Sequence, residues 1–101
     1  MDIVYSKNNV PIRLTEERWF HITEEHAELA GSYFEVLETI TDPETIYEGI
    51  GGECIAVREI EKDKYIVVLY KEIHKEDGFV ITAFFTKRRK QLERRRKVWE
   101  R

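Results

Sequence analysis

The spacing of apolar residues changes at Pro43, and this change limits the folds that the chain can adopt. Before Pro43, apolar residues recur every three or four positions over residues 19–29 and 34–40, which is typical of amphipathic helices. After Pro43, they alternate or run together in stretches of strand length. Because the strands follow the helices instead of alternating with them, the sequence predicts a single α+β domain and not a series of βαβ units.

The chain is expected to begin with a hairpin that leads into a first helix. Residues 3–5 and 10–14 flank a turn that contains two asparagines, which tolerate the positive φ angles of tight turns. Pro11 cannot donate a ladder hydrogen bond, so it predicts an edge position for the second strand. Thr15 is expected to cap the first helix, and Gly31 is expected to end it.

Two further helices are predicted, one on each side of the strand region. The first of them covers residues 32–40, and Phe34 is expected to point inward from it. The second is a strongly basic C-terminal helix over residues 87–101, with Leu92 and Trp99 as its best buried positions. The sequence thus predicts a hairpin and two helices, then a sheet, then a basic helix.

The sheet itself is expected to be small and antiparallel, with three to four strands. Its strands are predicted at residues 45–48, 53–60, 65–72 and 79–85. The third of these is apolar on both faces, which indicates a central strand. In the second, the alternation places Cys54, Ala56 and Arg58 on one face.

The charge of the chain is distributed very unevenly. Residues 87–101 contain nine basic and two acidic residues, a net charge of +7, whereas the preceding 86 residues carry −10. Such a difference in sign predicts either a polyanion such as RNA as partner or an acidic protein surface. In the second case, the basic helix would associate with the acidic face of another copy and form a homodimer.

Composition also gives expectations about the compartment and the source. No apolar run approaches the roughly 18–20 residues of a membrane helix, and the first residues lack the features of a secretory signal. Cys54 is the single cysteine, so no internal disulfide can form. We therefore expect a cytoplasmic protein without a membrane partner. The many charged residues, 37% of the chain, indicate a thermophilic source.

The sequence offers no pattern for a metal or a cofactor. His21 and His26 are five residues apart, or about 140° around a helix, so one helix face cannot present both to one ion. There is no CxxC or HExxH motif. The glycines at positions 49, 51 and 52 lack the Lys-Ser/Thr that follows them in a P-loop. We expect no metal ion and no cofactor.

The remaining candidates are side chains that cleave RNA without a metal ion. This reaction needs a group that deprotonates the 2′-hydroxyl, a group that protonates the leaving oxygen, and cations that stabilise the charge on phosphorus. His21, His26, Arg58 and Thr82 are the predicted catalytic residues, and Glu25 is spaced to orient His21 on the helix. The alternatives are histidines with a purely structural role and a cross-strand ion pair for Arg58.

Four basic residues are predicted to bind the RNA backbone. Lys71 lies at the end of the most apolar strand, and Lys87, Arg88 and Arg89 follow the aromatic pair at positions 84–85. Basic side chains beside aromatic rings suit phosphate binding and base stacking. In the alternative interpretation, the aromatic residues belong to the core and the basic residues form a solvated helix face.

Four segments of the chain form a recognisable set: IRLTEERWFHI at residues 12–22 with Glu25-His26, DPE at 42–44, YIVV at 65–68 and GFVITAF at 78–84. With these segments the chain resembles small prokaryotic and phage-associated proteins that are grouped with the barnase–EndoU–colicin–RelE class of nucleases. The layout also resembles the RelE-like toxins of the BrnT type. Their I-S-A-R strand end corresponds to ITAF at residues 81–84, so the signature arginine is absent, and Arg88 or Arg89 is its candidate substitute.

The resemblance implies a metal-independent ribonuclease, the toxin of a toxin–antitoxin pair, with an antitoxin protein as partner. It maps the helical histidine of the family onto His21 or His26, the basic strand residue onto Arg58, and the hydroxyl onto Thr82. Two alternatives remain open from the residues themselves. One is a nucleic-acid-binding module without activity, and the other is the homodimeric interaction domain.

Overall fold

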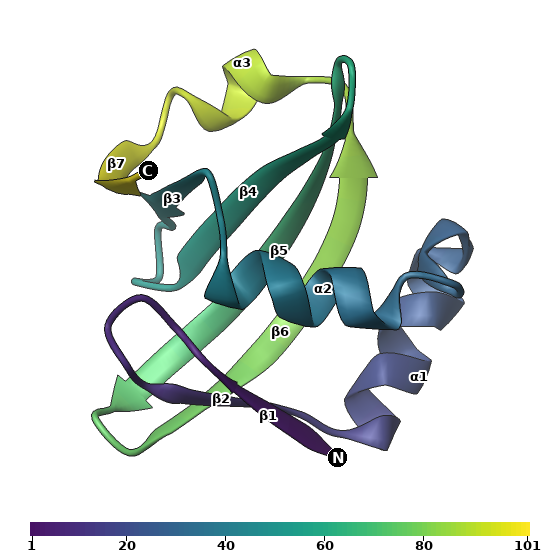
Figure 1. Ribbon diagram of the computed structural model, residues 1–101, viewed down its shortest axis with the longest axis vertical. Helices are drawn as coiled ribbons and strands as arrows, with labels where there is room; N and C mark the ends of the chain where they lie inside the picture. Colours follow the sequence, from purple (N-terminus) through teal and green to yellow (C-terminus); the bar gives the residue numbers. More distant parts are fainter.

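The computed structural model describes all 101 residues, and its strands form one curved sheet that the N-terminal helices cover on one face (Figure 1). The elements in chain order are β1 (Asp2–Tyr5), β2 (Pro11–Leu14), α1 (Glu16–Glu25), the 3-10 helix η1 (Ala27–Leu29), α2 (Tyr33–Thr41), β3 (Thr45–Glu48), β4 (Cys54–Glu61), β5 (Lys64–His74), β6 (Asp77–Thr86), α3 (Arg89–Leu92) and β7 (Arg96–Glu100). The α+β class is confirmed. No helix is both long and apolar enough to cross a membrane.

The sheet has seven strands in the order β1-β2-β6-β5-β4-β3-β7, so the expected three to four strands were too few. Every neighbouring pair is antiparallel except β2 and β6, which run parallel and pair Ile12 with Gly78 and Arg13 with Phe79. The strands beyond the predicted ones lie at the two edges of the sheet. The N-terminal hairpin joins the sheet through β6, and the C-terminal residues add β7 beside β3.

Alternating side chains divide the apolar residues between the two faces of the sheet. On one face, Ile66, Val68 and Tyr70 of β5 pack with the buried side chains of α1, η1 and α2. Figure 1 shows α2 lying across β5 and β6 on this face, which we call the helix face. On the opposite face, Val67 packs with buried residues of β3 and β4 and with partly buried Phe84. The expected period of two is therefore confirmed.

The N-terminal hairpin forms as predicted, but its place in the sheet differs. Asn9 adopts a φ of 61°, the left-handed conformation that suits asparagine in a tight turn. The edge strand is β1, and β2 lies inside the sheet, so the edge position predicted from Pro11 is wrong. Pro11 is tolerated because it is the first residue of β2, and pairing with β6 starts one residue later at Ile12.

Both N-terminal helices form, with two corrections. The Thr15 hydroxyl accepts a hydrogen bond from the Arg18 backbone N–H at 3.1 Å, as a helix cap does. The helix ends at Glu25 instead of reaching Gly31, because His26 leaves the helical conformation with φ −133° and ψ 71°. Phe34 does not point inward, since it is 76% exposed. The inward face of α2 is formed by Tyr33, Val36, Leu37 and Ile40.

The predicted basic helix over residues 87–101 is wrong. Only α3, four residues long, is helical, and residues 96–100 form β7, which pairs antiparallel with β3. Leu92 and Trp99, both partly buried, are too few to give a helix of this length an apolar face. As a strand, the segment gives β3 a second hydrogen-bonded neighbour. The Lys7 ammonium lies over the Trp99 ring, with 5.1 Å between Nζ and the ring centroid.

Gly78 is required where β6 passes between β2 and β5. A Cβ atom there would lie 2.5 Å from Ile12 Cδ1 and 2.6 Å from the Lys71 carbonyl oxygen. We expect Gly78→Ala to lower the free energy of unfolding by about 1–3 kcal/mol, because the backbone of one strand has to shift. Urea denaturation measures this change. Gly31→Ala is the matched control, since nothing lies within 4 Å of its Cβ position, and a loss of equal size there would contradict the steric explanation.

Candidate functional site

A hollow of about 610 Å³ opens between α1 and the C-terminal half of β6. It exists because β2 pairs with β6 only as far as Phe79, so the rest of that β6 edge has no strand neighbour. We call it the histidine hollow, and its lining residues are Arg18, His21, Ile22, Glu25, His26, Ile81, Thr82 and Phe84. The histidine hollow is therefore built from one helix and one strand edge that are distant in the sequence.

Three of the four predicted catalytic residues line this hollow: His21, His26 and Thr82. The angle of about 140° expected between the two histidines does not apply, because His26 lies beyond the last helical residue. Its backbone turns out of the helix, which lets its ring face the same hollow as His21. The tertiary structure thus brings together two side chains that an uninterrupted helix would separate.

The two histidines have different surroundings. His21 Nδ1 lies 3.4 Å from Glu24 Oε1, and His21 Nε2 lies 3.8 Å from Glu17 Oε1. These carboxylates, and not that of Glu25, are the ones next to His21. The ring of His26 instead packs against Phe84, with 6.0 Å between the ring centroids. Both imidazoles reach solvent, and the His21 side chain is 54% exposed.

Arg18 is the cation of the histidine hollow, and the sequence reasoning did not single it out. It forms no ion pair, although carboxylates are abundant on α1. Its spacing would have identified it, because Arg18 precedes His21 by three residues and Ile22 by four, the spacing of one helix face. A guanidinium without a carboxylate partner is available to an anionic ligand.

Arg58 and Lys71 lie outside the histidine hollow. Arg58 Nη1 forms an ion pair with Glu38 Oε1 at 2.6 Å, which joins β4 to α2 on the helix face. The ammonium of Lys71 donates a hydrogen bond to the Gly51 carbonyl oxygen at 2.7 Å, within the loop between β3 and β4. The predicted catalytic role of Arg58 and the predicted RNA contact of Lys71 stay predictions.

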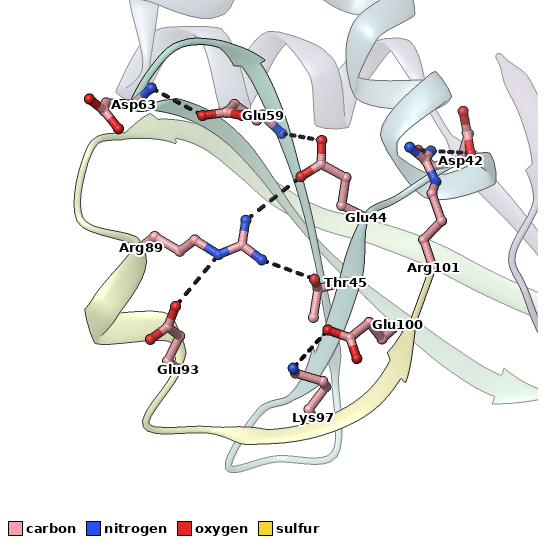
Figure 2. A network of polar contacts seen from close by, with 10 residues as sticks. All are labelled: Asp42, Glu44, Thr45, Glu59, Asp63, Arg89, Glu93, Lys97, Glu100 and Arg101. Atoms are coloured by element: carbon pink, nitrogen blue, oxygen red, sulfur yellow. Dashed lines mark hydrogen bonds and ion pairs between the residues drawn. The ribbon is translucent and has the colours of Figure 1, made fainter.

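Arg89 is held by several groups of its own chain (Figure 2). Its Nη2 donates to Thr45 Oγ1 at 3.1 Å, and its side chain lies 3.7 Å from carboxylate oxygens of both Glu44 and Glu93. The guanidinium also lies over the Tyr65 ring, 5.2 Å from its centroid. Arg89 therefore fastens α3 to β3 and β5, and its predicted contact with RNA stays a prediction.

Other basic residues of the C-terminal segment also pair with the acidic body of the same chain. Arg96 lies 3.9 Å from Glu48, and Arg101 forms an ion pair with Asp42 (Figure 2 shows the second pair). The hydrogen bond from Arg101 holds the pKa of the Asp42 carboxyl below its usual value. Some of the basic residues of this segment are thus already paired with acidic residues of the same chain. The basic helix on which the homodimer hypothesis relied does not form.

Five basic residues of this segment have no ion-pair partner: Lys87, Arg88, Lys90, Arg94 and Arg95. Arg94 and Arg95 line a second hollow of about 570 Å³, together with Ile55, Leu69, Phe84, Gln91 and Leu92. We call it the arginine hollow. Lys87, Arg88 and Lys90 line a third hollow of about 520 Å³ with Asp63 and Tyr65 among its other residues. The unpaired cations are therefore gathered around α3.

Cys54 is poorly suited to act as a nucleophile. Burial raises the pKa of its thiol to about 11, and the neighbouring Glu72 carboxylate adds to this shift. The thiol is therefore protonated at neutral pH, whereas nucleophilic attack requires the thiolate. No group of three or more His, Cys, Asp or Glu side chains is arranged to hold a metal ion.

Comparison with known proteins identified no relative of this chain. No protein-family model matches the chain, and searches of the curated proteins and of the solved structures found no match either.

Proposed function

We propose that the protein is a metal-independent endoribonuclease whose reaction takes place in the histidine hollow. One observation carries the proposal: His21, His26 and Thr82 line the same hollow as the unpaired Arg18. These residues supply two imidazoles, which are the commonest proton-transfer groups of enzymes, together with a hydroxyl and a fixed positive charge. They come from α1, from the residue that follows it, and from β6.

The reaction that fits this set is attack of the RNA on its own backbone. One histidine removes the proton of a 2′-hydroxyl, and the 2′-oxygen forms a bond to the adjacent phosphorus. The bond from phosphorus to the 5′-oxygen of the next nucleotide breaks, and the other histidine donates a proton to that oxygen. The products are a 2′,3′-cyclic phosphate and a 5′-hydroxyl, and no metal ion or other reactant takes part.

The remaining groups of the hollow support this transfer. The Arg18 guanidinium is able to stabilise the negative charge that builds up on the phosphoryl oxygens in the transition state. The Thr82 hydroxyl is able to donate a hydrogen bond to a non-bridging oxygen and so position the phosphate. The carboxylates of Glu17 and Glu24 lie beside His21 and limit the orientations of its ring.

The resemblance to the barnase–EndoU–colicin–RelE class and to BrnT-type toxins supports the same proposal and extends it. On this basis the protein is the toxin of a pair, acts on RNA in the cytoplasm, and is neutralised by an antitoxin protein. The signature arginine of the strand end is replaced by Phe84, but Arg18 reaches the same hollow from α1. A guanidinium is thus available there from a different element.

A second candidate function is a nucleic-acid-binding module without catalytic activity. The unpaired basic residues around α3 favour it, because phosphate contacts by Lys and Arg supply most of the non-specific affinity for nucleic acids. This candidate requires none of the histidines. It predicts salt-sensitive binding of RNA and DNA with no change in either strand.

A cleavage assay on a defined strand separates the two candidates. Purified protein is incubated with an end-labelled RNA, with and without EDTA, and with a DNA strand of the same sequence. We expect RNA products that end in a 2′,3′-cyclic phosphate, the same rate with EDTA, and an intact DNA strand, which lacks the 2′-hydroxyl. An RNA that is bound but never cut would favour the binding module and contradict the proposed nuclease.

A further inference from the structure

We infer that the substrate strand is single-stranded RNA, bound with one base stacked on Phe84 and the neighbouring phosphates held by Arg94 and Arg95. This inference rests on the proposed ribonuclease and names the form of its substrate and a second binding site. Its central observation is that Phe84 lines both the histidine hollow and the arginine hollow. The two hollows therefore adjoin at one aromatic ring.

The arginine hollow combines an apolar floor with a cationic rim. Ile55, Leu69 and Leu92 form the apolar part, whereas Arg94 and Arg95 are exposed and have no carboxylate partner. A site for phosphate alone would gain nothing from the apolar floor. Such a floor contributes only when another apolar surface covers it, and the face of a nucleobase is the apolar surface that an RNA strand offers.

This combination favours a single strand over a duplex. In a duplex, each base is stacked on its neighbours and paired with its partner, so its face is not available to a protein ring. In a single strand, a base is free to leave the stack and cover Phe84 while its backbone runs along the cations. Lys87, Arg88 and Lys90 precede Arg94 and Arg95 in the same basic segment, and they extend the cationic surface beyond the arginine hollow.

The position of Phe84 connects this second site with the proposed chemistry. The centroid of the Phe84 ring lies 6.0 Å from that of His26. A base stacked on Phe84 therefore brings its ribose, or that of an adjacent nucleotide, next to the histidine hollow. Binding energy from a group that does not react would then position the reacting phosphate.

The test measures binding to a strand that cannot be cut. The probe is a fluorescent oligonucleotide with 2′-O-methyl groups throughout, followed by anisotropy over a range of salt concentrations. We expect Phe84→Leu to weaken binding about tenfold, because leucine keeps an apolar side chain but has no aromatic face. We expect Arg94→Gln/Arg95→Gln to make the negative slope of log K against log salt shallower by about 1.4, the loss of two phosphate contacts.

The control variant Lys62→Gln/Lys75→Gln removes two charges from exposed turns outside the hollows, and we expect a much smaller change in the slope. The same oligonucleotide annealed to its complementary strand should bind less tightly than the single strand. Unchanged binding by both the Phe84 and the arginine variants, or a preference for the duplex, would overturn the inference even if RNA is cleaved. If the expected binding pattern holds but unmodified RNA stays intact, the binding site stands and the proposed nuclease fails.

Discussion

His21→Ala and His26→Ala are each expected to slow RNA cleavage by about 10²–10⁴-fold, the usual contribution of one general acid or base. Both side chains line the histidine hollow, and each would transfer one of the two protons that the reaction moves. The rate is measured under single-turnover conditions, so that product release does not hide the loss. The rate loss of the double variant is expected to be smaller than the product of the two single losses, because the effects of groups that act together on the activation free energy are not additive.

His74→Ala is the matched control for both variants. His74 is the last residue of β5, and its Nδ1 accepts a hydrogen bond from the Glu76 backbone N–H in the turn that follows, at 3.1 Å. It is exposed and does not line the histidine hollow, so cleavage should keep its wild-type rate. If the His21 and His26 variants cut RNA as fast as the His74 variant, the histidine hollow is not the active site.

Ile40→Ala is expected to lower the free energy of unfolding by about 2–5 kcal/mol, whereas Phe34→Ala on the same helix should lower it by less than about 1 kcal/mol. Ile40 is fully buried against the helix face of the sheet, so its truncation leaves a cavity. Phe34 is largely exposed, and the only ring that it packs against is that of Tyr33, with 5.3 Å between centroids. Urea denaturation of both variants measures the difference.

This pair of variants tests the orientation of α2, which the sequence alone predicted differently at Phe34. Both substitutions replace a large apolar residue by alanine in the same helix. Isoleucine and phenylalanine have similar helix propensities, so the change in propensity is nearly the same at the two positions. Equal losses at the two positions would mean that the helix is rotated relative to the structure. A large loss of unfolding free energy only at Phe34 would mean that Phe34 faces inward on α2 and Ile40 faces outward.

The paired charges of the C-terminal segment show why net charge along the sequence was an incomplete guide to partners. Residues 87–101 oppose the acidic body in sign, and in the structure Arg89, Arg96 and Arg101 contact carboxylates of β3 and the residues just before it. Surface ion pairs of this kind each contribute little to the stability of the fold, but a basic side chain that is paired with a carboxylate is less available to another anion. The residues left without a partner, such as Arg94 and Arg95, are the ones that remain available to RNA.

Local patterns in the sequence were enough to predict most individual elements. The alternation in β4 placed Cys54 and Ala56 on one face, which the structure shows to be the helix face. The continuous apolar run of β5 indicated a strand buried on both faces. Thr15 predicted the start of α1. The helix predicted over residues 32–40 forms as α2, with Phe34 pointing outward instead of inward. These features depend on residues within a few positions of one another, which is why periodicity and capping predict them.

The features that assemble the candidate site were decided by the tertiary structure. The parallel pairing of β2 with β6 stops at Phe79 and leaves the strand edge on which α1 lies, and the departure of His26 from the helix turns its ring toward His21. Residues 96–100 became a strand because β3 offered unpaired backbone groups, although the sequence itself favoured a helix. Each of these outcomes depends on groups far apart in the chain, because a backbone hydrogen bond or an ion pair is specified by both partners and a local pattern describes only one.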